Sequence, residues 1–226
     1  MLNFKKWLFS LIILLGTTMS CSKLSDLPFA SVRAGKVGFY NVIPNSGAID
    51  FYINGTRQNT NKIAYGDYSG YMNITSGQQS VLFKLDSLRN DLIPAQTVNI
   101  LTDSTTVFVT GTQSAPTLFF ARDTAKVDSK NIKQKFRFIN VSSDSPAFDV
   151  AMNSVSIANQ PYKSISAFAR IDTGKVVLKV NITGTSTIVK TTTYTLASNR
   201  VYTLFAYGSY KSGSTAGLNF RLVTNH

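Results

Sequence analysis

Residues 39–54 read FYNVIPNSGAIDFYIN, and residues 138–153 read FINVSSDSPAFDVAMN. The second stretch lies 99 residues after the first. Identical positions match without a gap, among them Asn41, Val42, Ala48, Asp50 and Asn54 with Asn140, Val141, Ala147, Asp149 and Asn153. At an offset of 97, Phe108 and Gly111 also match Phe205 and Gly208. Because self-similarity at a fixed spacing indicates a repeated structural unit, we predict two tandem domains, residues 37–123 and 134–226, with a polar linker over 124–133.

Each repeat carries the pattern of β-strands. Ile49, Phe51 and Ile53 alternate with other residues and are followed at once by Asn54 and Gly55. Alternation is typical of a half-buried strand, and Asn-Gly favours a two-residue hairpin turn with positive φ. All eleven acidic residues are Asp, so the chain lacks Glu, a favoured helix residue. Short strands separated by turn residues predict an all-β fold, a sandwich or barrel.

Composition argues against several kinds of chemistry. The single His is His226, and the single Cys is Cys21. Catalysis by a buried His, disulfides, and zinc or haem held by His and Cys are therefore disfavoured. We expect no cofactor, no metal and no enzymatic activity. A hydrolase that uses paired Asp residues is the second alternative to this expectation.

The first twenty residues have the order of a secretory signal. Lys5 and Lys6 precede an apolar run over residues 7–15, and small residues follow up to Cys21. As a helix this run would rise about 14 Å, against a hydrocarbon core of about 30 Å, so it is too short to span a bilayer. An ordinary secretory signal beside a free thiol is one reading of this segment.

Cys21 directly after this segment resembles the lipobox of bacterial lipoproteins, in which the thiol is acylated. The resemblance implies a signal peptide over 1–20, a lipidated tether over 21–36 and attachment to the membrane through acyl chains on Cys21. Ser22 after the Cys implies sorting to the outer membrane, facing either the periplasm or the cell surface.

Beyond the tether, the Asn-Val opening of each repeat, the Tyr-rich stretch over 64–71 and the Gly77 turn before Val81 are similar to one known family. They resemble the family called domain of unknown function 4397. Its members are exported, are common among Bacteroidetes lipoproteins, and are taken to be immunoglobulin-like β-sandwiches, often in tandem. The resemblance implies two such sandwiches here. It implies no activity, because the family has none assigned.

The Asx residues of the two openings could offer oxygen ligands to calcium. They are Asn41, Asp50 and Asn54 in the first copy and Asn140, Asp149 and Asn153 in the second. A calcium site needs six to eight oxygens, usually with several carboxylates, whereas each set has one carboxylate. Asx side chains also satisfy backbone groups at turns and strand ends without an ion. We therefore interpret both sets as structural.

Tyr65, Tyr68 and Tyr71 could form an aromatic platform that binds sugar rings. The matching residues of the second copy, Tyr162, Ile165 and Phe168, keep hydrophobicity but not aromaticity. Core packing requires only hydrophobicity, so packing is the favoured interpretation. The sugar platform supports the first alternative function, a carbohydrate-binding accessory lipoprotein that captures glycans.

The formal net charge is +12, a balance that could attract polyanions. The basic residues are scattered, however, apart from a group at the linker that we interpret as a solvated hinge: Lys126, Lys130, Lys133, Lys135 and Arg137. No recognised nucleic-acid module is present, so nucleic acid is not an expected partner.

Three Asp-Ser/Thr triplets resemble the acceptor sequence of Bacteroidetes O-glycosylation. They make Ser87, Ser104 and Thr124 candidate sites of modification. Together these observations predict an exported, lipid-anchored, non-catalytic binding or structural module of the bacterial cell envelope. Its partner would be an unidentified envelope protein or a glycan.

Overall fold

The computed structural model describes residues 33–85, 91–127, 134–211 and 216–225, and every regular element in them is a β-strand. The strands of repeat 1 are β1 (Ala34–Asn41), β2 (Ile49–Ile53), β3 (Thr56–Arg57), β4 (Tyr68–Thr75), β5 (Gly77–Leu85), β6 (Asp91–Ile100), β7 (Ser104–Gly111) and β8 (Pro116–Arg122). Those of repeat 2 are β9 (Gln134–Asn140), β10 (Phe148–Met152), β11 (Val155–Gln160), β12 (Ser164–Ile165), β13 (Ala169–Ile171), β14 (Gly174–Ile182), β15 (Ile188–Leu196), β16 (Val201–Tyr207) and β17 (Asn219–Asn225). The predicted all-β class is confirmed.

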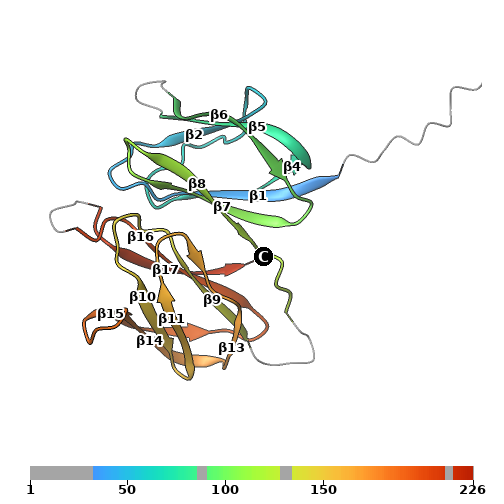
Figure 1. Ribbon diagram of the computed structural model, residues 1–226. Coiled ribbons are helices and arrows are strands. Elements are labelled where there is room, and N and C mark those ends of the chain that lie inside the picture. Colours follow the sequence, from blue (N-terminus) through green and yellow to red (C-terminus); the bar gives the residue numbers. More distant parts are fainter. Residues whose placement is uncertain (1–32, 86–90, 128–133, 212–215, 226) are drawn as a thin grey trace, which may run out of the picture. The chain divides into compact units, whose positions relative to one another are not determined.

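Repeat 1 is a sandwich of two four-stranded sheets (Figure 1). One sheet has the order β4-β1-β7-β8 and the other β3-β2-β5-β6. Phe39 of β1 meets the opposite sheet at Phe51 and Phe83, with ring centroids 3.9 and 5.3 Å away. All three side chains are buried, because the apolar faces of the two sheets pack against each other.

Repeat 2 is built in the same way. Its sheets have the orders β12-β9-β16-β17, with β13 also beside β9, and β11-β10-β14-β15. In each repeat the first strand pairs in parallel with a late one, β1 with β7 and β9 with β16. Parallel neighbours need a long crossover, and here the other sheet supplies it. The predicted sandwich architecture is therefore confirmed, and its strand order differs from the ABED and CFG sheets of immunoglobulin domains.

The inner strands are buried on both faces. All seven residues of β16 are buried, and β1, β7 and β9 are nearly as continuous. Strands have such continuous runs of buried residues when both faces of their sheet are covered. A third apolar cluster covers the second face, because sheet β4-β1-β7-β8 packs on sheet β12-β9-β16-β17: Tyr40, Val42, Phe108, Ala121, Ile139, Val141, Phe205 and Tyr207. The sheets of β1 to β17 thus form four layers within one compact unit.

The predicted hairpin turn is confirmed between β2 and β3. Asn54 and Gly55 have φ values of +47° and +79°, as a turn with two left-handed residues requires. Asn153 occupies the matching turn of repeat 2 with φ +49°. Among the residues that the structure describes, no helix is long and apolar enough to cross a membrane.

Candidate functional site at the junction of the repeats

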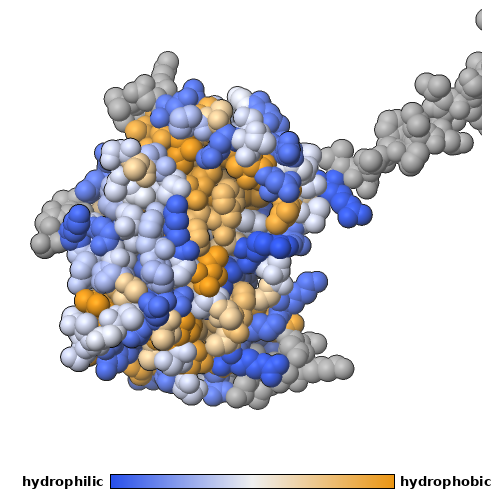
Figure 2. Space-filling view, viewed as in Figure 1, coloured by the Kyte–Doolittle hydropathy of each residue, from blue (hydrophilic) through white to orange (hydrophobic). Residues whose placement is uncertain are grey.

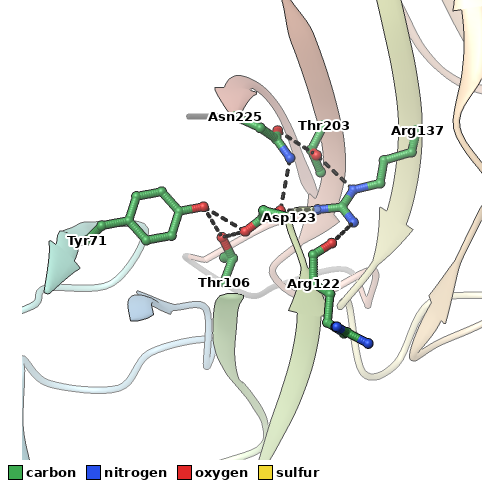
Figure 3. A network of polar contacts seen from close by, with 7 residues as sticks. All are labelled: Tyr71, Thr106, Arg122, Asp123, Arg137, Thr203 and Asn225. Atoms are coloured by element: carbon green, nitrogen blue, oxygen red, sulfur yellow. Dashed lines mark hydrogen bonds and ion pairs between the residues drawn. The ribbon is translucent and has the colours of Figure 1, made fainter. Parts of the chain in front are cut away.

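A buried ion pair joins the two repeats (Figure 3). Asp123 follows directly after β8, and Arg137 lies on β9. Their side chains are only 1% and 3% exposed. Charges at this depth are tolerated only when they are paired and hydrogen-bonded, so the surrounding donors and acceptors decide whether the junction is stable.

The Asp123 carboxylate is saturated with donors. One oxygen accepts from the guanidinium of Arg137 and from Nδ2 of Asn225, the latter at 2.9 Å. The other oxygen accepts from the hydroxyls of Tyr71 at 2.6 Å and Thr106 at 2.7 Å. Four donors on two oxygens leave the carboxylate little capacity to act on a ligand.

All three nitrogen atoms of the Arg137 guanidinium donate hydrogen bonds. Its Nε donates to Thr203 Oγ1 at 2.9 Å, and a terminal nitrogen donates to the backbone carbonyl of Arg122 at 2.8 Å. The guanidinium carbon lies 4.7 Å from the ring centroid of Phe168. The planar cation is thus hydrogen-bonded at its edge and stacked on its face, as suits arginine at a desolvated contact.

The surroundings shift the pKa values of Arg137 and Tyr71 in opposite directions. Burial lowers the pKa of Arg137, but the Asp123 carboxylate opposes that change. Burial raises the pKa of Tyr71, and the nearby negative charge of Asp123 raises it further. The Tyr71 hydroxyl therefore stays protonated at neutral pH and remains a donor to the carboxylate.

A small cavity of about 120 Å³ lies beside the ion pair, lined in part by Tyr40, Tyr68 and Tyr71. Its charged lining residues, Asp123 and Arg137, are already hydrogen-bonded to protein partners. A ligand would have to compete with these bonds. The arrangement is therefore better suited to joining the sandwiches than to chemistry on a bound molecule.

The junction relates the two repeats by an approximate two-fold axis. Phe108 and Phe205, which match at an offset of 97, contact each other with ring centroids 5.0 Å apart. Asp123 bonds to the backbone of Ser104, and Asn225 pairs with Val201. Because Ser104 and Val201 match at the offset of 97, their strand partners Asp123 and Asn225 are structurally equivalent. These two residues also contact each other. Equivalent residues meet in this way at a two-fold interface.

Away from the axis, a loop residue of each repeat contacts the last strand of the other repeat. Arg221 on β17 donates to the carbonyl of Gly66, which precedes β4. In the opposite sense, Lys163, the equivalent of Gly66, donates to Thr117 on β8 at 3.0 Å. The junction of the two repeats therefore has the pattern of a homodimer interface, formed within one chain.

The ion pair breaks this symmetry. The equivalent of Arg137 is Gly38, and the equivalent of Asp123 is the neutral Asn225. The Tyr68 side chain occupies the space beside Gly38, since a Cβ at position 38 would lie 2.1 Å from the Tyr68 hydroxyl. The junction thus has one charge pair where exact symmetry would require two or none.

Another pair of equivalent residues is adapted to these two charges. Tyr71 donates its hydroxyl to Asp123, whereas its equivalent Phe168 presents its ring face to Arg137. A hydroxyl serves the carboxylate and a π-face serves the cation. The change from Tyr to Phe between the copies therefore follows from the charge that each ring touches.

All three tyrosines predicted as a sugar platform lie at this junction. The Tyr65 ring lies 5.9 Å from the Tyr207 ring, and burial raises the pKa of Tyr65 to about 12. Tyr68 stacks on Tyr40 at 4.4 Å, and Tyr71 bonds to Asp123. The rings are half-buried, and Tyr65 contacts repeat 2 directly. Sugar binding by them stays a prediction.

The signature asparagines Asn41 and Asn140 are fully buried at the ends of β1 and β9. The Asn41 amide donates to the carbonyls of Gly47 and Ile63 at 3.1 and 3.2 Å. The Asn140 amide donates to the carbonyl of Gln160 at 3.1 Å. Both side chains thus tie the loops around the first strand of each repeat.

The signature aspartates have different partners in the two copies. Asp50 pairs with Arg57 at 2.6 Å. Asp149 accepts from the backbone of Asn159 and from the Thr183 hydroxyl, both at 2.8 Å. These bonds lower the pKa of Asp149.

Asn54 and Asn153 act at the turns after β2 and β10. Asn54 Oδ1 accepts from the backbone N–H of Ser80 at 2.9 Å, and Asn153 Oδ1 accepts from that of Val177 at 2.8 Å. Each turn is thereby bonded to the neighbouring strand β5 or β14. Over the described ranges of the chain, no group of three or more His, Cys, Asp or Glu residues could hold a metal ion.

The candidate modification sites differ in accessibility. Thr124 is exposed, and Ser104 is half-buried at the start of β7. The carboxylate before Thr124 is the buried Asp123, while the one before Ser104 pairs with Arg122 at the surface. Ser87 and the lipidation candidate Cys21 lie outside the described residues.

A second cavity, an apolar groove of about 300 Å³, opens between the edge strands β6 and β8 of repeat 1. Figure 2 shows apolar side chains gathered over these strands. The groove is lined by Val37 and Val98, whose equivalents in repeat 2 are the larger Phe136 and Tyr194. Repeat 2 thus packs aromatic side chains into its core where repeat 1 is open.

The interpretation of Arg137 as part of a solvated hinge is wrong, because the residue is buried on β9. The group at the junction was missed because Asp123 and Arg137 do not form a motif in sequence. Arg137 alternates with Phe136 and Phe138, as a residue on a solvent-facing side of a strand would. The local pattern therefore gave no signal that Arg137 is buried.

Comparison with known proteins agrees with the repeat structure. The model of the family described as "Domain of unknown function (DUF4397)" matches residues 35–151 and 134–225. The chain belongs to this family. No curated protein matches this DUF4397 chain.

Two solved structures show a weak likeness to the DUF4397 chain. A leucine-rich repeat protein from Bacteroides thetaiotaomicron has 15% identity and a TM-score of 0.23, and the match covers 76% of this chain and 26% of that one. A family CBM26 module of Amy13K from Eubacterium rectale, solved with maltoheptaose, has 11% identity and a TM-score of 0.27, with 83% and 96% covered.

Proposed function

We propose that this DUF4397 protein is a non-catalytic binding or structural module of the bacterial cell envelope, anchored to the outer membrane through acyl chains on Cys21. The observation that carries the proposal is the junction: its Asp, Arg and Tyr side chains bond to each other and join the two sandwiches. A pair of sandwiches joined by a buried interface can present a surface in a fixed orientation.

The states of the carboxylates support a non-catalytic role over an Asp-based hydrolase. The acid of such an enzyme needs a raised pKa. Asp149 has a lowered pKa instead, and so does Asp144, where hydrogen bonds from Ser209 and Tyr210 outweigh partial burial. Asp123, the most buried of the three, is already saturated with donors.

Membrane attachment is tested with a Cys21→Ser variant expressed in the native host. We expect the unaltered protein in the membrane fraction, with an acylated N-terminal peptide in mass spectrometry, and the variant in the soluble fraction. Retention of Met1, or a bare thiol at position 21 in the native product, would contradict the proposal.

Glycan capture is a second candidate, and a polar groove in repeat 1 favours it. The groove encloses about 430 Å³ beside Tyr68 and is lined by side chains that can bond to hydroxyl groups, among them Gln58, Asn61, Lys62 and Asp67. A few convergent polar groups beside an aromatic ring suit a sugar. Binding on a glycan array that is lost in Asn61→Ala and kept in Asn99→Ala would support it.

A further inference from the structure

We propose that the Asp123–Arg137 pair determines which repeats can associate. The junction face of repeat 1, formed by β1, β7 and β8, would accept the junction face of a repeat 2 and reject a second copy of repeat 1. The partner that fits is therefore the second repeat, in the same chain or in another copy of it.

The geometry of the junction makes like-with-like pairing the obvious competitor. Most equivalent positions carry compatible residues on both faces, such as Phe108 with Phe205 and Thr106 with Thr203. The hydroxyls of Thr106 and Thr203 also make the same bond, to Asp123 at 2.7 Å and to Asn225 at 2.8 Å. Shape and hydrophobicity alone would allow each face to pair with a copy of itself.

Two copies of repeat 1 would bring two carboxylates together. Asp123 contacts its equivalent Asn225 across the axis, so in a like pair it would contact a second Asp123. The guanidinium would be missing, because the position of Arg137 is taken by Gly38. Two buried carboxylates at this distance cannot both stay ionised without a large cost.

Two copies of repeat 2 would have the opposite fault. Each Arg137 would face an Asn225 where it now faces Asp123, so two guanidinium groups would be buried without a carboxylate. Removing one partner of a buried pair is costly because the remaining charge is uncompensated. Only the mixed pairing of repeat 1 with repeat 2 neutralises both charges. The charges therefore give specificity by destabilising the two like pairings.

The experiment uses the full chain with a protease site placed within residues 128–133. After cleavage of the folded protein, isotope-labelled and unlabelled material is mixed, and native mass spectrometry counts mixed and like pairs. We expect mixed pairs to exceed like pairs roughly a hundredfold. Like pairs as frequent as mixed pairs would overturn the proposal.

A double variant tests the charges directly. Asp123→Asn with Arg137→Gly gives both faces the residues Asn and Gly at these positions. We expect the preference for mixed pairs to fall to within a factor of about three. The matched control, Asp103→Asn, removes the exposed pair with Arg122 and should leave the preference unchanged. A double variant that keeps the full preference would refute the role of the charges.

A second readout covers the case in which the cut halves unfold. In uncut chains, thermal unfolding compares Asp123→Asn, Arg137→Met and the double variant that carries both changes. We expect each single variant to lower the melting temperature more than the double variant, because a single change leaves one buried charge without its partner. A double variant less stable than both single variants would count against the proposal.

Discussion

Repeats 1 and 2 have the same strand order, yet their junction faces carry different charges. Gly38 and Asp123 in repeat 1 correspond to Arg137 and Asn225 in repeat 2. The backbone therefore sets a two-fold geometry, while two substitutions make the faces complementary where they could have been identical. The comparison teaches that a duplicated domain can acquire a specific internal partner through a few buried side chains.

Removing one partner of the charge pair should have the largest effect on the free energy of unfolding. Arg137→Ala leaves Asp123 buried without its cation, and we expect a loss of about 3–5 kcal/mol in the free energy of unfolding. Urea denaturation followed by circular dichroism measures it. The neutral double variant Asp123→Asn with Arg137→Met should lose much less, because neither charge remains. A single-variant loss under about 1 kcal/mol would show that the pair is not desolvated.

Making repeat 1 larger at Gly38 should have the next largest effect. Gly38→Ala places a methyl group 2.1 Å from the Tyr68 hydroxyl, and overpacking of this kind costs about 1–3 kcal/mol. The cost should fall in a Tyr68→Ala background, since the clashing ring is then gone. Equal costs of Gly38→Ala in both backgrounds would mean that Tyr68 is not the obstacle.

Filling the apolar groove should erase the other difference between the repeats. Val98→Tyr introduces the residue that repeat 2 has at the equivalent position, and we expect a gain of about 0.5–2 kcal/mol from filling the cavity. Thermal unfolding measures it, with the exposed Val177→Tyr as a control that should change stability by no more than about 0.5 kcal/mol. A lower melting temperature for Val98→Tyr would show that the groove cannot accept the ring.

The smallest effect should come from acid. Partial burial of Asp144 favours its protonated form, but hydrogen bonds from Ser209, Tyr210 and Lys211 outweigh burial and lower its pKa below 3.8. Its stabilising contribution is therefore present above the unfolded value and is lost as pH falls through the lower folded value. The equivalent residue of repeat 1, Asn45, does not titrate.

Amide signals measure this difference between the repeats. In spectra recorded from pH 5 down to pH 2, we expect the Tyr210 amide to shift below pH 3.8, while amides around Asn45 stay in place. The shift should disappear in Asp144→Asn. A Tyr210 amide that titrates in this variant would assign the effect to another carboxylate.

Much of the fold was predictable because the relevant signals are local. The alternation of Ile49, Phe51 and Ile53 and the Asn54-Gly55 turn depend on neighbours in sequence, and both appear in the structure. The burial of β7 and β16 on both faces was not predicted. Their continuous apolar character depends on a second sheet that covers them, and an isolated strand pattern does not say whether one exists.

The candidate site was predictable only in part. The sequence indicated that Tyr65, Tyr68 and Tyr71 belong together, but it did not indicate that they meet repeat 2. Asp123 and Arg137 flank the linker, where polar residues usually reach solvent. Their burial depends on how two complete sandwiches pack, which is a long-range property.

The sequence by itself determined the duplication, the strand-forming pattern and the hairpin turns, because these follow from residue spacing and local backbone preferences. Only the tertiary structure decided that the outer faces of two sheets meet about a two-fold axis. It also decided that Arg137 finds Asp123 there, since a buried charge acquires its partner from whatever surface is packed against it.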